Sequence, residues 1–246
     1  MNGAIAAACA VCGAAASFFC RFLFNRVPAA WFCDYNEEPD PELFEKRLFL
    51  FPHGILMTTA LAALFLALYT QFFDKPLFLT AGCVVGMLLL LISASDVKYQ
   101  IIPDQFLLAF LFVSLVLSGF DLRSGQRVLH TGWSSPVLGA ALGAALMLVP
   151  AFAGKLILRR EALGFGDVKL FAAIGLLSGF PSIIPVFFLA IFLALFYIAF
   201  LFFRGKMKAD AALPLGPFLC LAQAGFLAFH RQINLFVHWY LSLLGM

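Results

Sequence analysis

The chain has 246 residues, of which 63% are hydrophobic and only 12% are charged. A soluble domain carries roughly a quarter charged residues, so this composition excludes an ordinary soluble protein and indicates a protein embedded in a lipid bilayer. The net charge of +3 is too small to suggest a nucleic-acid partner.

Eight apolar segments approach the length of about 20 residues that a membrane-spanning helix needs. We therefore expect an all-α, polytopic membrane protein with about eight transmembrane helices. In chain order, the predicted helices cover residues 3–24, 49–73, 77–95, 104–120, 134–158, 168–180, 182–203 and 211–230. The sixth is short, and the seventh follows it after Pro181. The aromatic tail 232–246 is predicted to lie in the membrane interface or to re-enter the membrane.

The distribution of lysine and arginine predicts the orientation of these helices, because cytoplasmic loops are enriched in both residues. With the N-terminus outside, 12 of the 16 lysines and arginines fall on the cytoplasmic side and four on the outer side. The cytoplasmic residues are Arg21, Arg26, Lys46, Arg47, Lys98, Lys155, Arg159, Arg160, Lys169, Arg204, Lys206 and Lys208. The outer residues are Lys75, Arg123, Arg127 and Arg231. We therefore expect a multi-pass protein with both termini outside.

Three aspartates lie at the ends of apolar segments on the predicted cytoplasmic side: Asp96, Asp104 and Asp167. A carboxylate in a membrane segment costs a few kcal/mol, and the other acidic residues are predicted to avoid this cost in loops. Each aspartate alone has a simpler explanation. Asp96 could be a polar helix end that reaches water, and Asp104 and Asp167 could be helix N-caps. Together, on one face of the membrane, they indicate an assembled site.

Two carboxyl groups brought together can hydrolyse a peptide bond without a metal. Like charges a few ångströms apart cannot both ionise, so the two groups share a proton. The ionised member takes a proton from water, whose oxygen attacks the peptide carbonyl, and the protonated member supports the oxyanion and protonates the leaving amine. Gly164 and Gly166, beside Asp167, would let the backbone and an extended substrate peptide approach closely.

The sequence GFGD at 164–167 has the form GxGD and resembles the aspartyl membrane proteases of that name. Further segments resemble one family among them, the type IV prepilin peptidases. These segments are ALGFGDVKLFAAIG (162–175), DVKYQIIPDQ (96–105), LPLGPFL (213–219) and the first helix with the arginine and proline that follow it (13–28).

The resemblance implies that Asp96 and Asp167 are the catalytic pair. The residues that it implies as supporting are Gly164, Gly166, Lys169, Pro103, Asp104, Pro214, Gly216 and Pro217. The implied substrate is the N-terminal leader of a prepilin or pseudopilin, cut at the cytoplasmic face of the inner membrane. Residues 48–246 would form the peptidase core, and residues 1–47 the first transmembrane helix with a short cytoplasmic loop.

The loop after the first helix departs from the family pattern. Bacterial prepilin peptidases typically carry two CxxC pairs there that look like a zinc site, but this loop holds only Cys33. Cys33 and His53 cannot supply the four ligands of a structural zinc site, so neither metal nor cofactor is expected. The family's second activity, N-methylation of the new N-terminus, is also not expected. S-adenosylmethionine would be a cofactor only if that activity were retained.

Two other functions are compatible with the same acidic residues. Intramembrane carboxylates also line proton and ion paths in transporters, although here they gather at one face and leave the bilayer centre without ionisable groups. A family member without catalysis, acting in pilus or secretion assembly, is the other alternative. Lys98 and Lys169 either anchor the helices at the lipid headgroups or stabilise negative charge on the neighbouring aspartates.

Overall fold

The computed structural model describes residues 3–33, 48, 54–158, 164–205 and 214–243, and every regular element among them is helical. Six helices among these residues are long and apolar enough to cross a membrane. They are α1 (Gly3–Arg26), α3 (Ile55–Phe72), α4 (Pro76–Tyr99), α5 (Asp104–Ser124), α6 (Ser135–Leu158) and α8 (Ile183–Phe203). The sixth and eighth predicted spans form the shorter helices α7 (Phe165–Ser178) and α9 (Gly216–Ala228). The all-α, polytopic prediction is confirmed.

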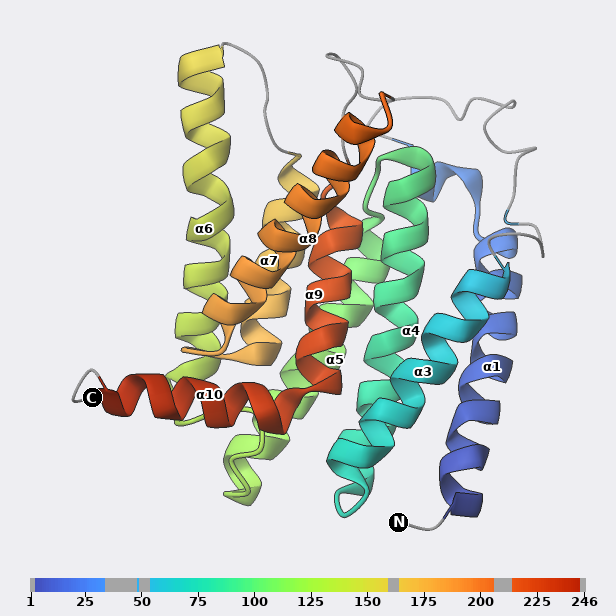
Figure 1. Cartoon of the computed structure of the whole chain (residues 1–246), viewed down its shortest axis with the longest axis vertical. Helices are drawn as coiled ribbons and strands as arrows, with labels where there is room; N and C mark the ends of the chain where they lie inside the picture. The colour runs from blue at the N-terminus through green and yellow to red at the C-terminus, as the bar shows by residue number, and fades with distance from the viewer. Residues whose placement is uncertain (1–2, 34–47, 49–53, 159–163, 206–213, 244–246) are drawn as a thin grey trace.

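These eight helices run alternately up and down, so that the connections gather at the two ends of the bundle (Figure 1). One end, which we call the aspartate end, holds the carboxyl end of α4 and the amino ends of α5, α7 and α9. Both chain termini lie toward the opposite end, which we call the terminal end (Figure 1). The predicted loop after the first helix, residues 34–47, lies outside the described residues.

Three predicted helix boundaries are wrong in ways that change the position of acidic residues. Helix α4 continues to Tyr99, beyond the predicted end at residue 95, so Asp96 lies inside the helix and not after it. Helix α7 begins at Phe165, three residues before the predicted start, because Gly164 is its N-cap and Gly166 continues the helix. Helix α5 continues to Ser124, beyond the predicted end at residue 120. Asp121 is therefore a fourth helical carboxylate rather than a loop residue, and its side chain is fully buried.

Helix α7 lies in the core of the bundle and is held there by close packing. Four of its apolar side chains are completely buried: Leu170, Phe171, Ile174 and Leu177. Glycines let α6 approach the backbone of α7 closely. A Cβ atom at Gly143 would lie only 2.5 Å from the carbonyl oxygen of Phe171, so a larger residue does not fit there. Small residues permit this close approach between membrane helices. The short GFGD helix is thus fixed along its length, which positions Asp167 at its first turn.

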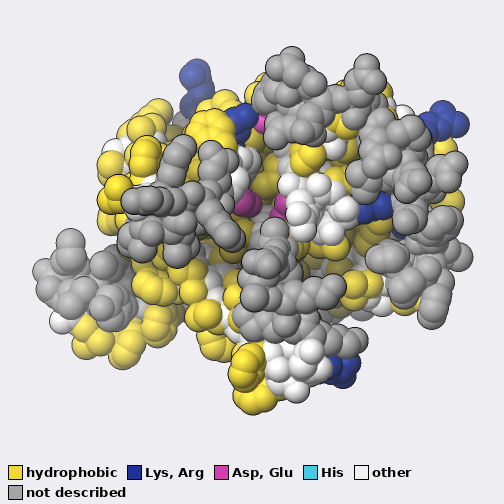
Figure 2. Space-filling model, turned by 90° about the horizontal axis from the view of Figure 1, so that it is seen from above, with side chains coloured by type: hydrophobic (Ala, Val, Ile, Leu, Met, Phe, Trp, Pro, Cys, Tyr) yellow, Lys and Arg dark blue, Asp and Glu magenta, His cyan; other side chains and the backbone are white. Residues whose placement is uncertain are grey.

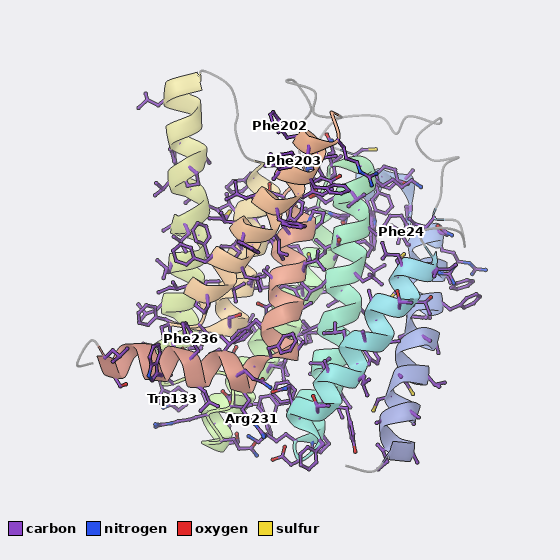
Figure 3. The ribbon with its side chains drawn as sticks, in the orientation of Figure 1. Phe24, Trp133, Phe202, Phe203, Arg231 and Phe236 are labelled. Atoms are coloured by element: carbon purple, nitrogen blue, oxygen red, sulfur yellow. The ribbon has the colours of Figure 1, made fainter. Side chains whose placement is uncertain are left out.

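Helix α8 turns a row of phenylalanines outward, as expected of a surface that faces lipid. Phe188, Phe192 and Phe196 are each about two-thirds exposed, and Phe202 and Phe203 project at the aspartate end of the helix (Figure 3).

The last described helix, α10 (His230–Leu243), runs across the terminal end instead of along the bundle (Figure 1). It exposes Phe236 and Trp239, whose ring centroids are 5.8 Å apart. Aromatic side chains of this kind are enriched where membrane meets water. The direction of α10 and its exposed aromatic rings are those expected of an interfacial helix.

Candidate functional site

The structure places Asp96 and Asp167 together at the aspartate end. Asp96 lies in the last turn of α4 and is only 6% exposed, so it is not a helix end that reaches water. Asp167 lies in the first turn of α7, is partly buried, and is not the N-cap of its helix. The two carboxyl groups are close enough to interact electrostatically. Seen from this end, acidic side chains are visible near the centre of the molecule (Figure 2).

Two neighbouring helices fix the spacing of this pair. Helices α5 and α9 each pack against both α4 and α7, which carry the two aspartates. Asp167 is further set by its own turn, where its N–H donates to the carbonyl oxygen of Gly164 at 3.1 Å. Its Oδ1 atom is buried and accepts no hydrogen bond from any residue that the structure describes. A buried carboxyl oxygen without a donor is costly, which is consistent with a group that meets a water or a substrate.

The late proline-glycine-proline segment meets Asp96 directly. The backbone N–H of Gly216, the first residue of α9, donates to Asp96 Oδ2 at 2.9 Å. A Cβ atom at this position would lie 2.6 Å from the same oxygen, so the contact requires glycine. Pro217 occupies the first turn of α9, where its missing N–H is not needed. Pro214 precedes this turn and is partly buried.

Lys169 pairs with Asp104 and not with the two central aspartates. Its Nζ lies 2.9 Å from Asp104 Oδ1 and 3.2 Å from Oδ2, and both side chains are about one-third exposed. Asp104 is the first residue of α5, and Pro103 is the N-cap. The ion pair therefore joins the amino ends of α5 and α7 beside the candidate site.

The two glycines of GFGD have different surroundings, and neither needs a left-handed backbone. Gly164 is exposed and extended, with φ −70° and ψ 142°. Gly166 faces the connection between α4 and α5, where a Cβ atom would lie 3.3 Å from Cβ of Ile102. The absence of a side chain at Gly166 lets α7 begin close to this connection.

Two further residues next to the pair were not recognised in the sequence. Ser95 is fully buried, and its hydroxyl donates to the carbonyl oxygen of Ile101 at 2.7 Å, which closes the turn after Asp96. Cys220 is buried one helical turn beyond Gly216 and lies within electrostatic range of both aspartates. The four-residue spacing from Gly216 is the sequence signal that would have placed Cys220 on this face of the helix.

The part of the chain that the structure describes contains no group of three potential metal ligands. Cys33 lies within that part, with its Sγ 3.5 Å from the carbonyl oxygen of Ala29, whereas His53 lies outside it. The chemistry that the site itself offers is that of two neighbouring carboxyl groups.

The fold and the site thus define a polytopic helical membrane protein with an acidic pair at one end of its bundle. The type IV leader peptidase family model matches residues 83–199 of this chain, a little less than half of it. The matched segment contains Asp96, Asp104, Asp167 and Lys169, whereas Gly216 lies beyond it. The predicted resemblance is confirmed.

Curated relatives are also named as leader peptidases. Proteins named prepilin leader peptidase/N-methyltransferase are 28% identical over 172 residues in Bacillus subtilis, 29% over 140 residues in Xanthomonas campestris and 33% over 135 residues in Pectobacterium carotovorum. In the same order, the matches cover 69%, 56% and 54% of this chain. They cover 62%, 46% and 45% of the length of the respective relatives. The chain therefore spans about half the length of the curated relatives that it matches. No solved structure is significantly similar.

Proposed function

We propose that this protein is a membrane-embedded aspartyl endopeptidase that removes the leader peptide from type IV prepilins or pseudopilins. One observation carries the proposal. Asp96 and Asp167 come from separate helices within the matched segment, and both lie at the same end of the bundle, close enough to interact electrostatically. The family supports a peptidase, and the acidic pair supplies a chemistry by which it can hydrolyse a peptide bond.

In the proposed reaction the two carboxyl groups hold one proton and one water between them. The ionised carboxylate takes a proton from the water, and the water oxygen forms a bond to the scissile carbonyl carbon. The protonated carboxyl group donates a hydrogen bond to the carbonyl oxygen, on which negative charge develops. The C–N bond then breaks as the amine takes a proton, which leaves a carboxylic acid on the leader and a new N-terminus on the pilin.

The substrate would approach at the aspartate end. Gly164 is exposed there beside Asp167, and so is the ring of Phe165, which is 68% exposed. An extended leader segment can lie against such a turn, where a backbone without a side chain permits close contact. The excess of lysine and arginine predicted at this end supports its placement at the cytoplasmic face of the inner membrane.

The proposal is tested by reconstituting the full-length protein in liposomes with a purified prepilin that retains its leader and its apolar helix. We expect a shortened pilin and a free leader, identified by mass spectrometry. We also expect the new N-terminus to lack the mass of an added methyl group, with or without S-adenosylmethionine. No cleavage, together with an ion flux that depends on Asp167, would contradict the proposal and favour a transporter.

The ion pair between Lys169 and Asp104 is expected to hold the two helix ends beside the site. Lys169→Gln or Asp104→Asn should slow cleavage about three- to tenfold and change the thermal stability little, since an exposed pair stabilises a fold by less than about 1 kcal/mol. The exchanged double variant Lys169→Asp/Asp104→Lys should recover most of the rate in the same assay. Slower cleavage in the exchanged variant than in either single variant would contradict a positioning role.

A further inference from the structure

A second polar site lies at the terminal end, remote from the aspartate pair. The turn after α3, the loop after α5 and the start of α10 line an open cavity of about 250 Å³. Its lining includes three cations, one from each segment: Lys75, Arg127 and Arg231. Asp74 is the acidic residue in the lining, so the charged groups sum to +2.

This convergence stands out because the terminal end has few cations. Four lysines and arginines are predicted at this end. Three of them line the same cavity, and Arg123 does not. Within the described part of the chain, none of the three makes a salt bridge. Asp74 offsets only one of the three positive charges, and like charges that converge repel one another, so the cavity is suited to an anion.

The loop that carries Arg127 is built rigidly. Arg127 has a left-handed backbone with φ 46°, which costs energy in a residue other than glycine. The next three residues are held by the buried carboxylate of Asp121. This carboxylate accepts hydrogen bonds from the backbone N–H groups of Val128, Leu129 and His130, at 2.6, 2.9 and 3.0 Å. These hydrogen bonds explain why the Asp121 carboxylate is buried: it anchors this loop.

Hydrogen bonds tie α10 to both other walls of the cavity. His230 Nε2 donates to the carbonyl oxygen of Val128 at 2.6 Å, and the N–H of Arg231 donates to Gln71 Oε1 at 3.2 Å. Burial lowers the pKa of His230, and the positive charges of Lys75 and Arg231 act in the same direction. At neutral pH His230 is therefore an uncharged donor that fixes the wall, and the three cations supply the positive charge.

The position of α10 indicates where the anion comes from. The helix lies across the end of the bundle with Phe236 on it and Arg231 at its start (Figure 3). It exposes Leu235, Phe236 and Trp239, which suits a helix at the surface of a membrane. Leu235 also lines the cavity, so an apolar side chain lies next to the cations. We propose that this cavity binds the phosphate of an anionic phospholipid headgroup, with the first carbons of the lipid against Leu235.

The test uses the full-length protein in a mild detergent, titrated with short-chain phosphatidylglycerol while thermal unfolding is followed. The double variant Arg127→Gly/Arg231→Gln removes two cations, and glycine accepts the left-handed backbone at position 127. We expect binding to weaken about tenfold for each cation removed. The matched control Arg123→Gln removes a cation of the same end that does not line the cavity, and it should bind as the unchanged protein does.

Two further probes separate the headgroup from its alternatives. Phosphatidylcholine of the same chain length should bind more weakly, because its choline group opposes the cations. Inorganic phosphate should also bind more weakly, because it lacks the apolar contact. Equal binding of phosphatidylglycerol by the double variant, or of phosphatidylcholine by the unchanged protein, would overturn the site. Inorganic phosphate that binds as tightly as the lipid would overturn the lipid as its occupant.

Discussion

Asp96→Asn and Asp167→Asn are each expected to reduce cleavage of a prepilin leader by at least about 1000-fold. Asparagine keeps the shape of aspartate but can neither take a proton from water nor share one with a partner. Either replacement therefore removes the acid–base pair while the packing around it stays nearly the same. Initial rates of leader release from a reconstituted prepilin measure the effect.

The matched control is Asp104→Asn, which makes the same chemical change at the same end of the bundle. Asp104 pairs with Lys169 at 2.9 Å and not with either central aspartate, so a measurable rate should remain. Thermal unfolding of all three variants checks that they fold. Cleavage by a folded Asp96→Asn or Asp167→Asn variant at a rate similar to that of Asp104→Asn would remove the aspartate pair from the mechanism.

Gly216→Ala is expected to slow cleavage about 100-fold, because small displacements of a catalytic group are costly. The added Cβ atom would lie 2.6 Å from Asp96 Oδ2 and 3.1 Å from its Cγ. The carboxyl group must therefore move away from the N–H that now holds it at 2.9 Å. The change acts on the geometry of Asp96 without altering any charge.

The control for this change lies on the same helix. A Cβ atom at Gly225 would lie 3.4 Å from Cδ2 of Leu189, which is an ordinary contact. Gly225→Ala should therefore cleave at nearly the original rate. Similar losses in both variants, or a Gly216→Ala variant with normal activity, would contradict the role of the Gly216 N–H in positioning Asp96.

The helical architecture could be predicted from apolar segment length alone, but several helix boundaries could not. Glycine disfavours helix, and the sequence accordingly predicts a helix that starts at residue 168, after GFGD. In the structure α7 begins at Phe165 and continues into the buried residues Leu170, Phe171 and Ile174. Asp121 was placed in a loop because a buried carboxylate is costly in a membrane protein. Three backbone N–H groups, visible only in the fold, offset that cost.

The acidic pair could be predicted from local motifs, but the contacts that position it could not. Gly216 lies 120 residues from Asp96, and Lys169 lies 65 residues from Asp104. No local pattern relates positions so far apart, and only the packing of α5 and α9 against both α4 and α7 brings them together. The same holds for Lys75, Arg127 and Arg231, whose wide separation along the chain conceals their convergence.

Cysteine cross-linking tests most directly whether the two aspartates form one centre. Cysteines replace Asp96 and Asp167 together, in a folded background without the six native cysteines, and a short bifunctional thiol reagent is applied in membranes. The reference pair replaces Asp104 and Lys169, and the distant pair replaces Asp96 and Asp121. We predict cross-linked peptides by mass spectrometry for the first two pairs and none for the third. A reference pair that cross-links while positions 96 and 167 do not would contradict a shared hydrolytic centre.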